Sequence, residues 1–377
     1  MDALVMGGGK MGLAVAHDLV RQGHRVTVAD INERCLQALP SLAEAVDLVH
    51  LDAARTEKVR ETLRGRDVAV SALPYDYNHQ LARLAIEQGV HFCDLGGNTG
   101  VVEREMSLHG AAVEAGVTVV PDCGLAPGLT NVLAAHLIEE HGPSRLHIRV
   151  GGLPRHPRPP LNYQLVFSVH GLVNEYVEPA RIIAGREVTQ VPSLTGLEPI
   201  AFESLPPLEA FYTSGGTSTL PHTFAGRLDR LDYKTIRYAG HCQALRLLRD
   251  LGFFDPPARP HTEEVLARAL EGDGPDLVLA RVSAARGDAV HVLEMVDHGD
   301  AEQGLSAMMR TTGFPTAVIA QMLADGTIPE RGVLTPERCV PPRPFLAQLR
   351  RRGLVIEERS GEPAAESGPP PPGTGSR

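Results

Sequence analysis

Near its start the chain reads Ala3-Leu4-Val5-Met6-Gly7-Gly8-Gly9-Lys10-Met11-Gly12, and this stretch decides how the first half folds. The four apolar residues predict a buried strand, and the apolar pattern of Leu13–Arg21 predicts a helix directly after the glycines. The spacing Gly7-x-Gly9-x-x-Gly12 at such a junction is typical of a dinucleotide-binding turn, because each glycine allows a close backbone approach. The N–H groups and the dipole at the helix start would then hold a diphosphate.

Apolar runs and helical patterns alternate from this turn to about residue 122. This alternation predicts βαβ units around a parallel sheet. Between the fourth and fifth strands, Asn78 is expected to cap a helix that Gly89 ends. The predicted strands are Ala3–Met6, Arg25–Ala29, Asp47–Leu51, Asp67–Leu73, Val90–Leu95 and Val117–Pro121. The first half is therefore predicted to be a doubly wound Rossmann domain.

The pattern changes after a helix that we expect to run from Pro127 to His141. A Pro-rich loop, Pro154 to Pro160, precedes alternating runs rich in Thr and Val, which are typical of a mostly antiparallel sheet. The strands predicted in this half are Arg145–Val150, Arg186–Val191, Tyr233–Tyr238, Leu277–Val282 and Val290–Val296. The predicted fold class is therefore α/β, with a Rossmann domain followed by an α+β domain.

These patterns divide the 377 residues into four predicted parts. Residues 1–124 form the dinucleotide-binding domain, and residues 125–304 form a domain for substrate binding and dimerisation. Residues 305–357, with a helix at Leu305–Leu323, are expected to pack back on the first domain. Residues 358–377 include a run of four prolines and are too polar to bury a core, which predicts a disordered tail.

Composition and charge argue against several classes of protein. A formal net charge of −10 provides no basic stripe for nucleic acid. No apolar stretch is long enough to cross a membrane, and the first strand follows Met1 too closely for a signal peptide. The five cysteines lack the spacing of a metal site or a disulfide framework. We therefore predict a cytoplasmic protein that binds no metal.

Asp30 ends the second predicted strand and indicates which dinucleotide would bind. A carboxylate there accepts hydrogen bonds from both ribose hydroxyls and repels a 2′-phosphate, which favours NAD over NADP. Arg34 could soften that preference, and Asp52 either contacts the adenine side or only starts the next turn. The residues predicted to bind the cofactor are Gly7, Gly9, Lys10, Met11, Gly12, Asp30, Asp52, Ala72, Leu73 and Pro74.

Three further segments, at residues 94–98, 121–128 and 213–219, combine polar side chains with glycines. Glycines at strand ends let the backbone approach a ligand, although any one of them is more often only a turn. The occurrence of three such segments in one chain favours a functional site.

Longer motifs around these segments make the chain similar to a known family. The motifs are Pro-Asp-Cys-Gly-Leu-Ala-Pro-Gly at 121–128, Val-Gly-Gly-Leu-Pro at 150–154, Phe-Ser-Val-His-Gly-Leu-Val-Asn-Glu-Tyr at 167–176, Glu-Ala-Phe-Tyr-Thr-Ser-Gly-Gly-Thr-Ser-Thr at 209–219 and Tyr-Lys-Thr-Ile-Arg-Tyr-Ala-Gly-His at 233–241. Over about residues 1–355 the chain resembles the L-lysine 6-dehydrogenases, a branch of the saccharopine dehydrogenase-like enzymes. Where saccharopine reductases place an arginine for the glutarate moiety, this chain has small hydroxyl residues.

The resemblance implies oxidation of the ε-carbon of L-lysine by NAD, then hydrolysis of the imine to ammonia and an aldehyde that cyclises. Hydride leaves only from a neutral amine, yet a lysine ammonium has a pKa of about 10.4, so a base or a desolvated pocket must remove a proton. The candidate catalytic residues are Asp122, Glu175, Lys234 and His241, with Asp122 near the nicotinamide. The candidate substrate-binding residues are Tyr75, Gly97, Thr217, Thr235 and Arg237, the last for the α-carboxylate.

Other interpretations of these residues and of the function stay open. Asp122 could only cap a helix, Lys234 could be an edge-strand charge, and His241 could be structural. The enzyme could instead be a reductive condensing dehydrogenase of the saccharopine or carboxynorspermidine type that uses NADPH, although Asp30 and residues 213–219 argue against it. A non-enzymatic NAD-binding protein is a third class. We expect a small-molecule substrate and a homo-oligomer, in particular a dimer.

Overall fold

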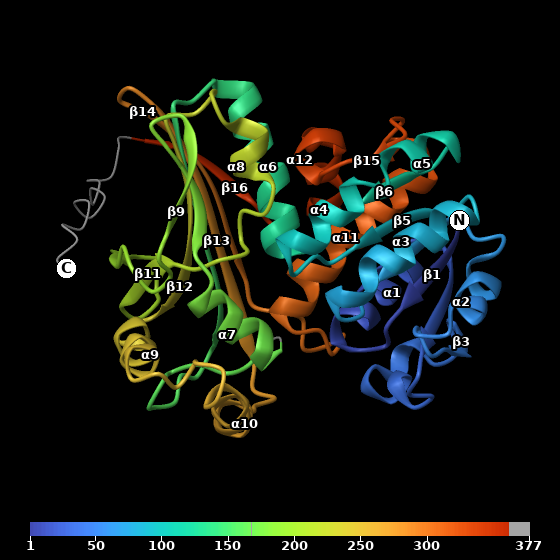
Figure 1. The fold of residues 1–377 in the computed structure, drawn as a ribbon, viewed down its shortest axis with the longest axis horizontal. Coiled ribbons are helices and arrows are strands. Elements are labelled where there is room, and N and C mark those ends of the chain that lie inside the picture. The colour runs from blue at the N-terminus through green and yellow to red at the C-terminus, as the bar shows by residue number, and fades with distance from the viewer. Residues whose placement is uncertain (167, 362–377) are drawn as a thin grey trace. The chain divides into compact units, whose positions relative to one another are not determined.

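The computed structural model describes residues 1–166 and 168–361 of the chain (Figure 1). These residues fall into two compact units. The first unit comprises residues 1–136, 218–220 and 297–356, and the second comprises residues 137–217, 221–296 and, of the described residues beyond these, 357–361. Each unit is therefore assembled from separate stretches of the sequence.

The first unit is built on a parallel sheet with the strand order β15-β6-β5-β4-β1-β2-β3. Its strands are β1 (Asp2–Met6), β2 (Arg25–Asp30), β3 (Asp47–His50), β4 (Val68–Ser71), β5 (His91–Asp94), β6 (Thr118–Val120) and β15 (Gly332–Val333). The order confirms the predicted doubly wound Rossmann sheet. Strand β15, from a distant part of the sequence, adds a further strand beside β6.

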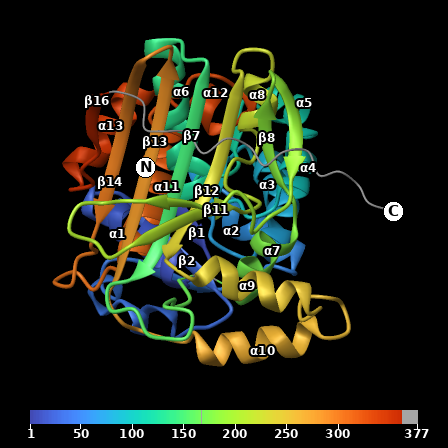
Figure 2. The same ribbon diagram turned by 90° about the vertical axis from the view of Figure 1, so that its left-hand side faces the viewer.

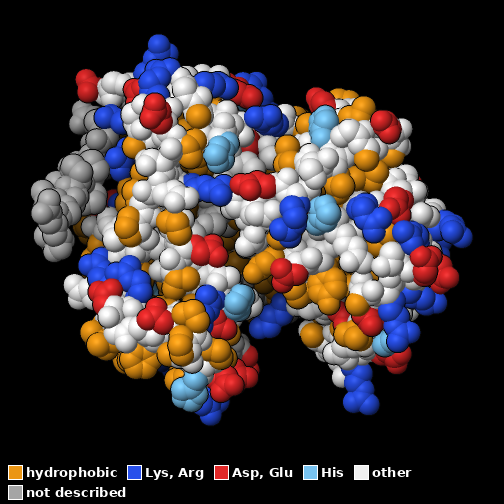
Figure 3. All heavy atoms as spheres, in the orientation of Figure 1, with side chains coloured by type: hydrophobic (Ala, Val, Ile, Leu, Met, Phe, Trp, Pro, Cys, Tyr) orange, Lys and Arg blue, Asp and Glu red, His pale blue; other side chains and the backbone are white. Residues whose placement is uncertain are grey.

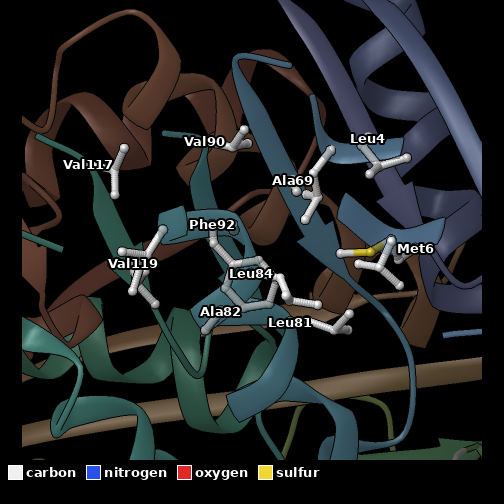
Figure 4. Packing of buried hydrophobic residues seen from close by; sticks show 14 of the residues in the cluster. Leu4, Met6, Ala69, Leu81, Ala82, Leu84, Val90, Phe92, Val117 and Val119 are labelled. Carbon is white, nitrogen blue, oxygen red and sulfur yellow. The ribbon is translucent and has the colours of Figure 1, made fainter. Parts of the chain in front are cut away.

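The helices of this unit include several that pack against the sheet and bury its apolar side chains. The helices are α1 (Lys10–Arg21), α2 (Thr56–Leu63), α3 (Asn78–Glu87), α4 (Thr99–Met106), α5 (His109–Glu114), α11 (Ala307–Ala324), α12 (Pro336–Cys339) and α13 (Pro342–Arg351), while α6 (Thr130–His141) begins in the first unit and ends in the second. Figure 4 shows part of one core cluster, to which Leu4, Ala69 and Phe92 of three neighbouring strands and Leu84 of α3 all belong. Strands buried on both faces explain the continuous apolar runs in the sequence.

Helix α11 packs closely on α1 through small residues. A Cβ atom on Gly313 would lie 2.6 Å from the Cβ atom of Ala14, so only glycine allows this approach. The side chain of Ser306 caps α11 by accepting a hydrogen bond from the N–H of Met309 at 3.1 Å. The helix continues through Pro315 to Ala324.

The second unit is built on a mixed sheet with the strand order β10-β11-β12-β7-β13-β14-β16, in which β8 also pairs with β12 and β9. Its strands are β7 (Arg145–Pro154), β8 (Ala180–Ala184), β9 (Glu187–Val191), β10 (Glu198–Ile200), β11 (Leu208–Tyr212), β12 (Arg230–Tyr238), β13 (Asp276–Arg286), β14 (Ala289–Asp297) and β16 (Glu357–Gly361). Figure 2 shows β14, β13, β7 and β12 side by side. Strands β7 and β12 run parallel, whereas the described pairs β10–β11, β11–β12, β8–β12, β7–β13, β14–β16 and β8–β9 run antiparallel. This arrangement confirms the predicted mostly antiparallel domain.

The helices that belong to the second unit lie in the connections between its strands. They are α7 (Val169–Val177), α9 (His241–Asp250) and α10 (Arg259–Ala269), and α8 (Leu220–Phe224) starts at the last residue of the 218–220 segment. Apolar residues of α7, α9 and α10, including Val173, Leu245 and Leu266, form one core cluster.

Local sequence predictions need correction at two helix starts. Asn78 does not cap α3, because it is the first helical residue and its Oδ1 accepts a hydrogen bond from Ser71 Oγ at 2.8 Å. The helix expected from Pro127 begins at Thr130, since residues 126–128 have non-helical backbone angles. A tertiary hydrogen bond of the Asn78 side chain and the non-helical backbone of residues 126–128 therefore determine where these two helices begin.

The predicted boundaries also differ from the compact units. The first unit extends beyond residue 124 to residue 136, and it takes in residues 218–220 and 297–304, which the sequence analysis assigned to the second domain. Residues 358–361, expected in the disordered tail, belong to β16 because their backbone pairs with β14. Residues 362–377 of the expected tail lie outside the described residues.

The charged side chains on the face drawn in Figure 3 are mixed in sign, with acidic and basic groups interspersed. This mixed face differs from the continuous basic surface that follows a nucleic-acid backbone. Among the helices of the described residues, none combines the length and the apolar composition that crossing a bilayer requires.

A buried ion pair joins α1 to the end of the first unit. The Nε of Arg352 lies 2.8 Å from both carboxylate oxygens of Asp18, and both residues are less than 10% exposed. Burial raises the pKa of Asp18 although Arg352 opposes the shift. The loss of hydration therefore offsets much of the attraction between the two charges.

The variant Arg352→Met should lower the free energy of unfolding by about 3–5 kcal/mol, because it leaves the Asp18 carboxylate buried without its partner. The double variant Asp18→Leu/Arg352→Met should lose less stability, since neither charge remains. Urea unfolding of the full chain measures both values. A double variant that is no more stable than Arg352→Met would contradict the interpretation.

Candidate active site

The glycine turn between β1 and α1 leaves no room for side chains at two of its positions. A Cβ atom on Gly12 would lie 1.9 Å from the carbonyl oxygen of Gly7, and one on Gly7 would lie 2.7 Å from the carbonyl oxygen of Ala72. A Cβ atom on Gly9 would meet nothing within 4 Å, so the space before the helix is open. The N–H groups of Lys10 and Met11 in the first turn of α1 can therefore hold an anion there.

Asp30 lies beside this turn at the end of β2. Its Oδ2 accepts a hydrogen bond from the N–H of Gly8 at 2.5 Å, and its Oδ1 accepts one from the N–H of Asn32 at 2.7 Å. A carboxylate oxygen can accept more than one hydrogen bond, so Asp30 retains capacity for ribose hydroxyls. Asp52 instead accepts a hydrogen bond from the N–H of Ala54 at 3.0 Å, which matches the turn-starting interpretation.

The segment that follows β4 approaches the same turn. Residues 72–74 connect β4 to Tyr75, and the N–H of Ala72 donates to the carbonyl oxygen of Met6 at 2.8 Å. The ring of Tyr75 covers Gly97, where a Cβ atom would lie 2.9 Å from Tyr75 Cδ1. The structure thus brings together two residues that the sequence analysis proposed for the substrate.

Asp122 follows β6 and is a buried carboxyl in an unusual backbone conformation. Its φ angle of 60° lies in the left-handed region that non-glycine residues rarely occupy, and the residue is 2% exposed. Ser218 Oγ donates a hydrogen bond to Asp122 Oδ2. Burial and the negative charges of Asp94 and Glu337 raise the pKa of Asp122 to about 8. This carboxyl can therefore exchange a proton at mildly alkaline pH.

Residues that the sequence analysis did not name complete this cluster. Glu337 of α12 accepts hydrogen bonds from Thr219 Oγ1 at 2.8 Å and from Asn131 Nδ2 at 3.3 Å. Glu105 of α4 is fully buried, and burial together with the charge of Asp94 raises its pKa to about 11. An acidic residue on a helix is usually exposed, so the sequence carried no signal for either glutamate.

The second unit holds a separate buried network around Arg237. The Nε of Arg237 donates to Tyr176 Oη at 3.3 Å, and Tyr176 Oη lies 2.9 Å from His241 Nε2. The Nδ1 of His241 lies 3.0 Å from the carbonyl oxygen of Leu161, which can only accept, so Nδ1 carries the proton. Tyr176 then donates to Nε2. Burial and the charge of Arg237 lower the pKa of His241 to about 3, so the imidazole stays neutral.

Glu175 and Thr235 are near this network, and Thr217 is held elsewhere in the same unit. Glu175 Oε2 lies 4.0 Å from Arg237 Nη2, and burial raises the pKa of Glu175 to about 7 against the effect of Arg237. Thr235 Oγ1 lies 2.7 Å from Thr213 Oγ1. Thr217 Oγ1 donates to the carbonyl oxygen of Arg181 at 3.3 Å.

Lys234 lies on the opposite face of β12 from Thr235, because neighbouring side chains alternate along a strand. Its ammonium pairs with Glu198, whose other oxygen accepts a hydrogen bond from Arg149 Nε at 2.6 Å. Burial and the charge of Arg149 lower the pKa of Lys234. The structure therefore separates Lys234 from His241, with which the sequence analysis had grouped it as a candidate for proton transfer.

His141, His291 and Glu358 bring possible metal-ligand atoms within 4.8 Å of one another in the second unit. The two imidazole rings are stacked with their centroids 3.5 Å apart and an interplanar angle of 5°. A metal ion lies close to the plane of each imidazole that binds it, and parallel stacked planes do not meet this requirement. We therefore do not assign a metal centre to these residues.

Two family models match the sequence over nearly all of the residues described above. One, for the saccharopine dehydrogenase NADP binding domain, matches residues 3–120. The other, for the saccharopine dehydrogenase C-terminal domain, matches residues 124–354. Residues 3–120 thus form a pyridine-nucleotide-binding domain, in agreement with the glycine turn.

Individual relatives are distant in sequence. Mitochondrial alpha-aminoadipic semialdehyde synthase of Rattus norvegicus is 23% identical over 444 residues, covering 95% of this chain and 47% of that protein. This chain therefore spans about half of that relative's length. The saccharopine dehydrogenase [NADP(+), L-glutamate-forming] of Pyricularia oryzae is 24% identical over 451 residues, covering 95% and 98%. Apo saccharopine dehydrogenase (L-Glu forming) from Saccharomyces cerevisiae has the same fold, with a TM-score of 0.78, 19% identity and coverage of 96% and 99%.

The variant Gly9→Ala should weaken NADH binding by at least about tenfold, or about 1.4 kcal/mol, because its methyl group would enter only the space that a diphosphate needs. Its melting temperature should equal that of the unmodified chain. Gly12→Ala serves as the contrasting variant and should lose both binding and thermal stability, since its methyl group would collide with Gly7. Fluorescence titration and thermal unfolding measure these effects, and unchanged NADH affinity in Gly9→Ala would refute the assignment.

Proposed function

The chain belongs to the saccharopine dehydrogenase family, and from this premise we propose that it is an NAD-dependent amino-acid dehydrogenase. In this proposal it oxidises the ε-carbon of L-lysine and releases the ε-amino group as ammonia. The product, 2-aminoadipate 6-semialdehyde, then cyclises to piperideine-6-carboxylate. The observation that carries the proposal is the buried Asp122 carboxyl, with its pKa raised to about 8, at the carboxyl edge of a dinucleotide-binding sheet.

The overall reaction converts lysine ammonium, NAD and water to aldehyde, ammonium, NADH and one proton. NAD accepts the hydride from the ε-carbon. The protein must first remove a proton from the ammonium, whose pKa is about 10.4 in water. An ionised Asp122 can accept that proton, and burial of the amine lowers the pKa of the ammonium and narrows the difference between the two groups.

Other residues have supporting roles in the proposal. Arg237 would pair with the α-carboxylate, and Tyr75, Gly97, Thr217 and Thr235 would contact the substrate. Glu175, with a pKa raised to about 7, is the second group suited to proton transfer during imine hydrolysis. No proton-transfer role falls to Lys234, which is paired with Glu198, or to His241, which stays neutral.

The choice of NAD rests on Asp30, whose charge opposes a 2′-phosphate at the end of β2. A specific observation favours a second candidate, because the matching family model and the Pyricularia oryzae relative both have NADP in their names. That candidate is a reductive condensing dehydrogenase that joins an amine to an aldehyde with NADPH. We further propose a cytoplasmic homodimer, as expected for a dehydrogenase of this kind.

Purified protein should form NADH when mixed with NAD and L-lysine at mildly alkaline pH, and it should release one ammonia per NADH. L-ornithine, cadaverine and saccharopine test substrate selectivity, and NADP in place of NAD tests the role of Asp30. Inactivity with lysine, together with NADPH oxidation in the presence of an amine and an aldehyde, would instead establish the condensing reaction.

The value of kcat/KM for lysine should rise with pH through about 8, because the Asp122 carboxyl holds a proton below its pKa and accepts one above it. Asp122→Asn should lower kcat by about 10²–10⁴-fold. The amide oxygen can still accept the hydrogen bond from Ser218, so the variant should fold.

Stability gives an independent measure of the same carboxyl. Its pKa rises from 3.8 to about 8 on folding, so ionisation of Asp122 removes stability as the pH increases across this interval. Asp122→Asn should therefore be at least as stable as the unmodified chain at pH values above about 8. Denaturant unfolding below and above about pH 8 measures the difference in stability between Asp122→Asn and the unmodified chain. A variant that is less stable than the unmodified chain only at high pH would count against a raised pKa of Asp122.

A further inference from the structure

Glu105 and Asp94 are two buried carboxyl groups of the first unit with too few hydrogen-bond donors around them. Both residues are 0% exposed. Among the described residues, no other group donates a hydrogen bond to Oδ2 of Asp94 or to either carboxyl oxygen of Glu105, and the two carboxyl groups lie within hydrogen-bonding reach of each other. Two carboxylates cannot hydrogen-bond to each other, because neither carries a proton to donate. A buried pair of this kind is satisfied only when one carboxyl holds a proton and donates it to the other.

The surroundings of the two carboxyls decide which one holds the proton. Asp94 Oδ1 accepts hydrogen bonds from the N–H groups of Gly96 at 2.6 Å and Asp122 at 3.3 Å, and these donors favour its ionised form. Burial nevertheless raises the pKa of Asp94 to about 6. Burial and the charge of Asp94 raise the pKa of Glu105 to about 11, with only Arg104 opposing the shift. Glu105 is therefore the acid and Asp94 the acceptor.

Asp94 also restrains the turn that carries Asp122. Its side chain accepts the N–H of Asp122, and its main-chain oxygen accepts the N–H of Cys123 at 2.7 Å. The left-handed backbone of Asp122, with φ of 60°, needs such restraint because a non-glycine residue pays a conformational cost there. Gly96, which is bound to the same Asp94 oxygen, lies so close that a Cβ atom on it would be 2.0 Å from Asp122 Oδ1.

We propose that Glu105 is a positioning residue, which holds one proton against Asp94 and through Asp94 fixes the Asp122 turn. Glu105 acts on the reaction only through these two residues. The kinetic part of this inference rests on the proposed function, whereas the location of the proton does not. Because Glu105 is then neutral, the cluster carries one negative charge fewer than its number of acidic residues suggests. The charged groups that face Asp122 are Asp94 and Glu337 of α12.

The proton can be located without any turnover. At pH 9, above the pKa of about 8 for Asp122, the full chain should still show the infrared carbonyl stretch of a protonated buried carboxyl. Glu105→Gln should abolish this band. Glu103→Gln, on the exposed part of the same helix, is the matched control and should retain it. The absence of the band from the unmodified chain, or its persistence in Glu105→Gln, would overturn the proposal.

Kinetics then test the positioning role. The amide of Glu105→Gln can still donate to Asp94 Oδ2, so its kcat should stay within about threefold, less than 1 kcal/mol, of the unmodified value. Glu105→Leu removes the donor, which makes Asp94 easier to protonate and weakens the negative charge beside Asp122. Its kcat should fall at least about tenfold, and the alkaline rise of kcat/KM should move to lower pH.

Each outcome of this series has a separate meaning. Equal pH profiles for Glu105→Leu and Glu105→Gln, with both variants folded by circular dichroism, would refute the positioning role. If the unmodified chain does not oxidise lysine at all, the proposed function fails. The infrared band would still decide whether Glu105 holds the proton. The hydrogen-exchange rate of the Asp122 N–H in Glu105→Leu would then replace the kinetic measurement. An exchange rate equal to that of the unmodified chain would refute the positioning role of Glu105.

Discussion

The contact between Gly7 and Gly12 is the constraint on which the first unit depends. Because the carbonyl oxygen of Gly7 occupies the place of a Cβ atom on Gly12, helix α1 starts directly against the end of β1. Helix α11 packs on α1 with equally little space at Gly313. The carboxyl ends of the parallel strands therefore share one edge with the start of α1, and this topology places Asp30 and Asp122 at the same edge although they are distant in sequence.

The buried charged groups have opposite surroundings in the two units. In the first unit, acidic groups gather and raise one another's pKa, so that Asp122 titrates near pH 8. In the second unit, Arg149 lies 2.7 Å from Asp232 and 2.6 Å from Glu198, and the pKa of Asp232 falls well below its usual range. A group that stays charged at every accessible pH can orient or brace, whereas a carboxyl near its pKa can transfer a proton.

Periodic patterns predicted the architecture better than the site. The strands of the Rossmann sheet and the glycine turn follow from local apolar runs, and Asp122 stood out because it follows a strand in a glycine-rich segment. Glu105 has no such signal, because its burial depends on tertiary packing of α4, which contacts α3. Lys234 was grouped with His241 as a candidate for proton transfer, but the fold pairs Lys234 with Glu198 and places His241 against Tyr176. Ser218 was within a quoted segment, yet only the fold shows that it joins the first unit.

The composition of the first unit also constrains the order in which the protein can form during synthesis on the ribosome. Residues 1–136 emerge before the second unit, but α11 and β15, which cover α1 and extend the sheet beside β6, come from residues 297–356. The edge of the nascent Rossmann sheet beside β6 therefore stays unpaired until most of the second unit, up to residue 296, has been translated. Such late, long-range pairing slows folding and leaves an aggregation-prone edge exposed, which gives chaperones a defined interval in which to act.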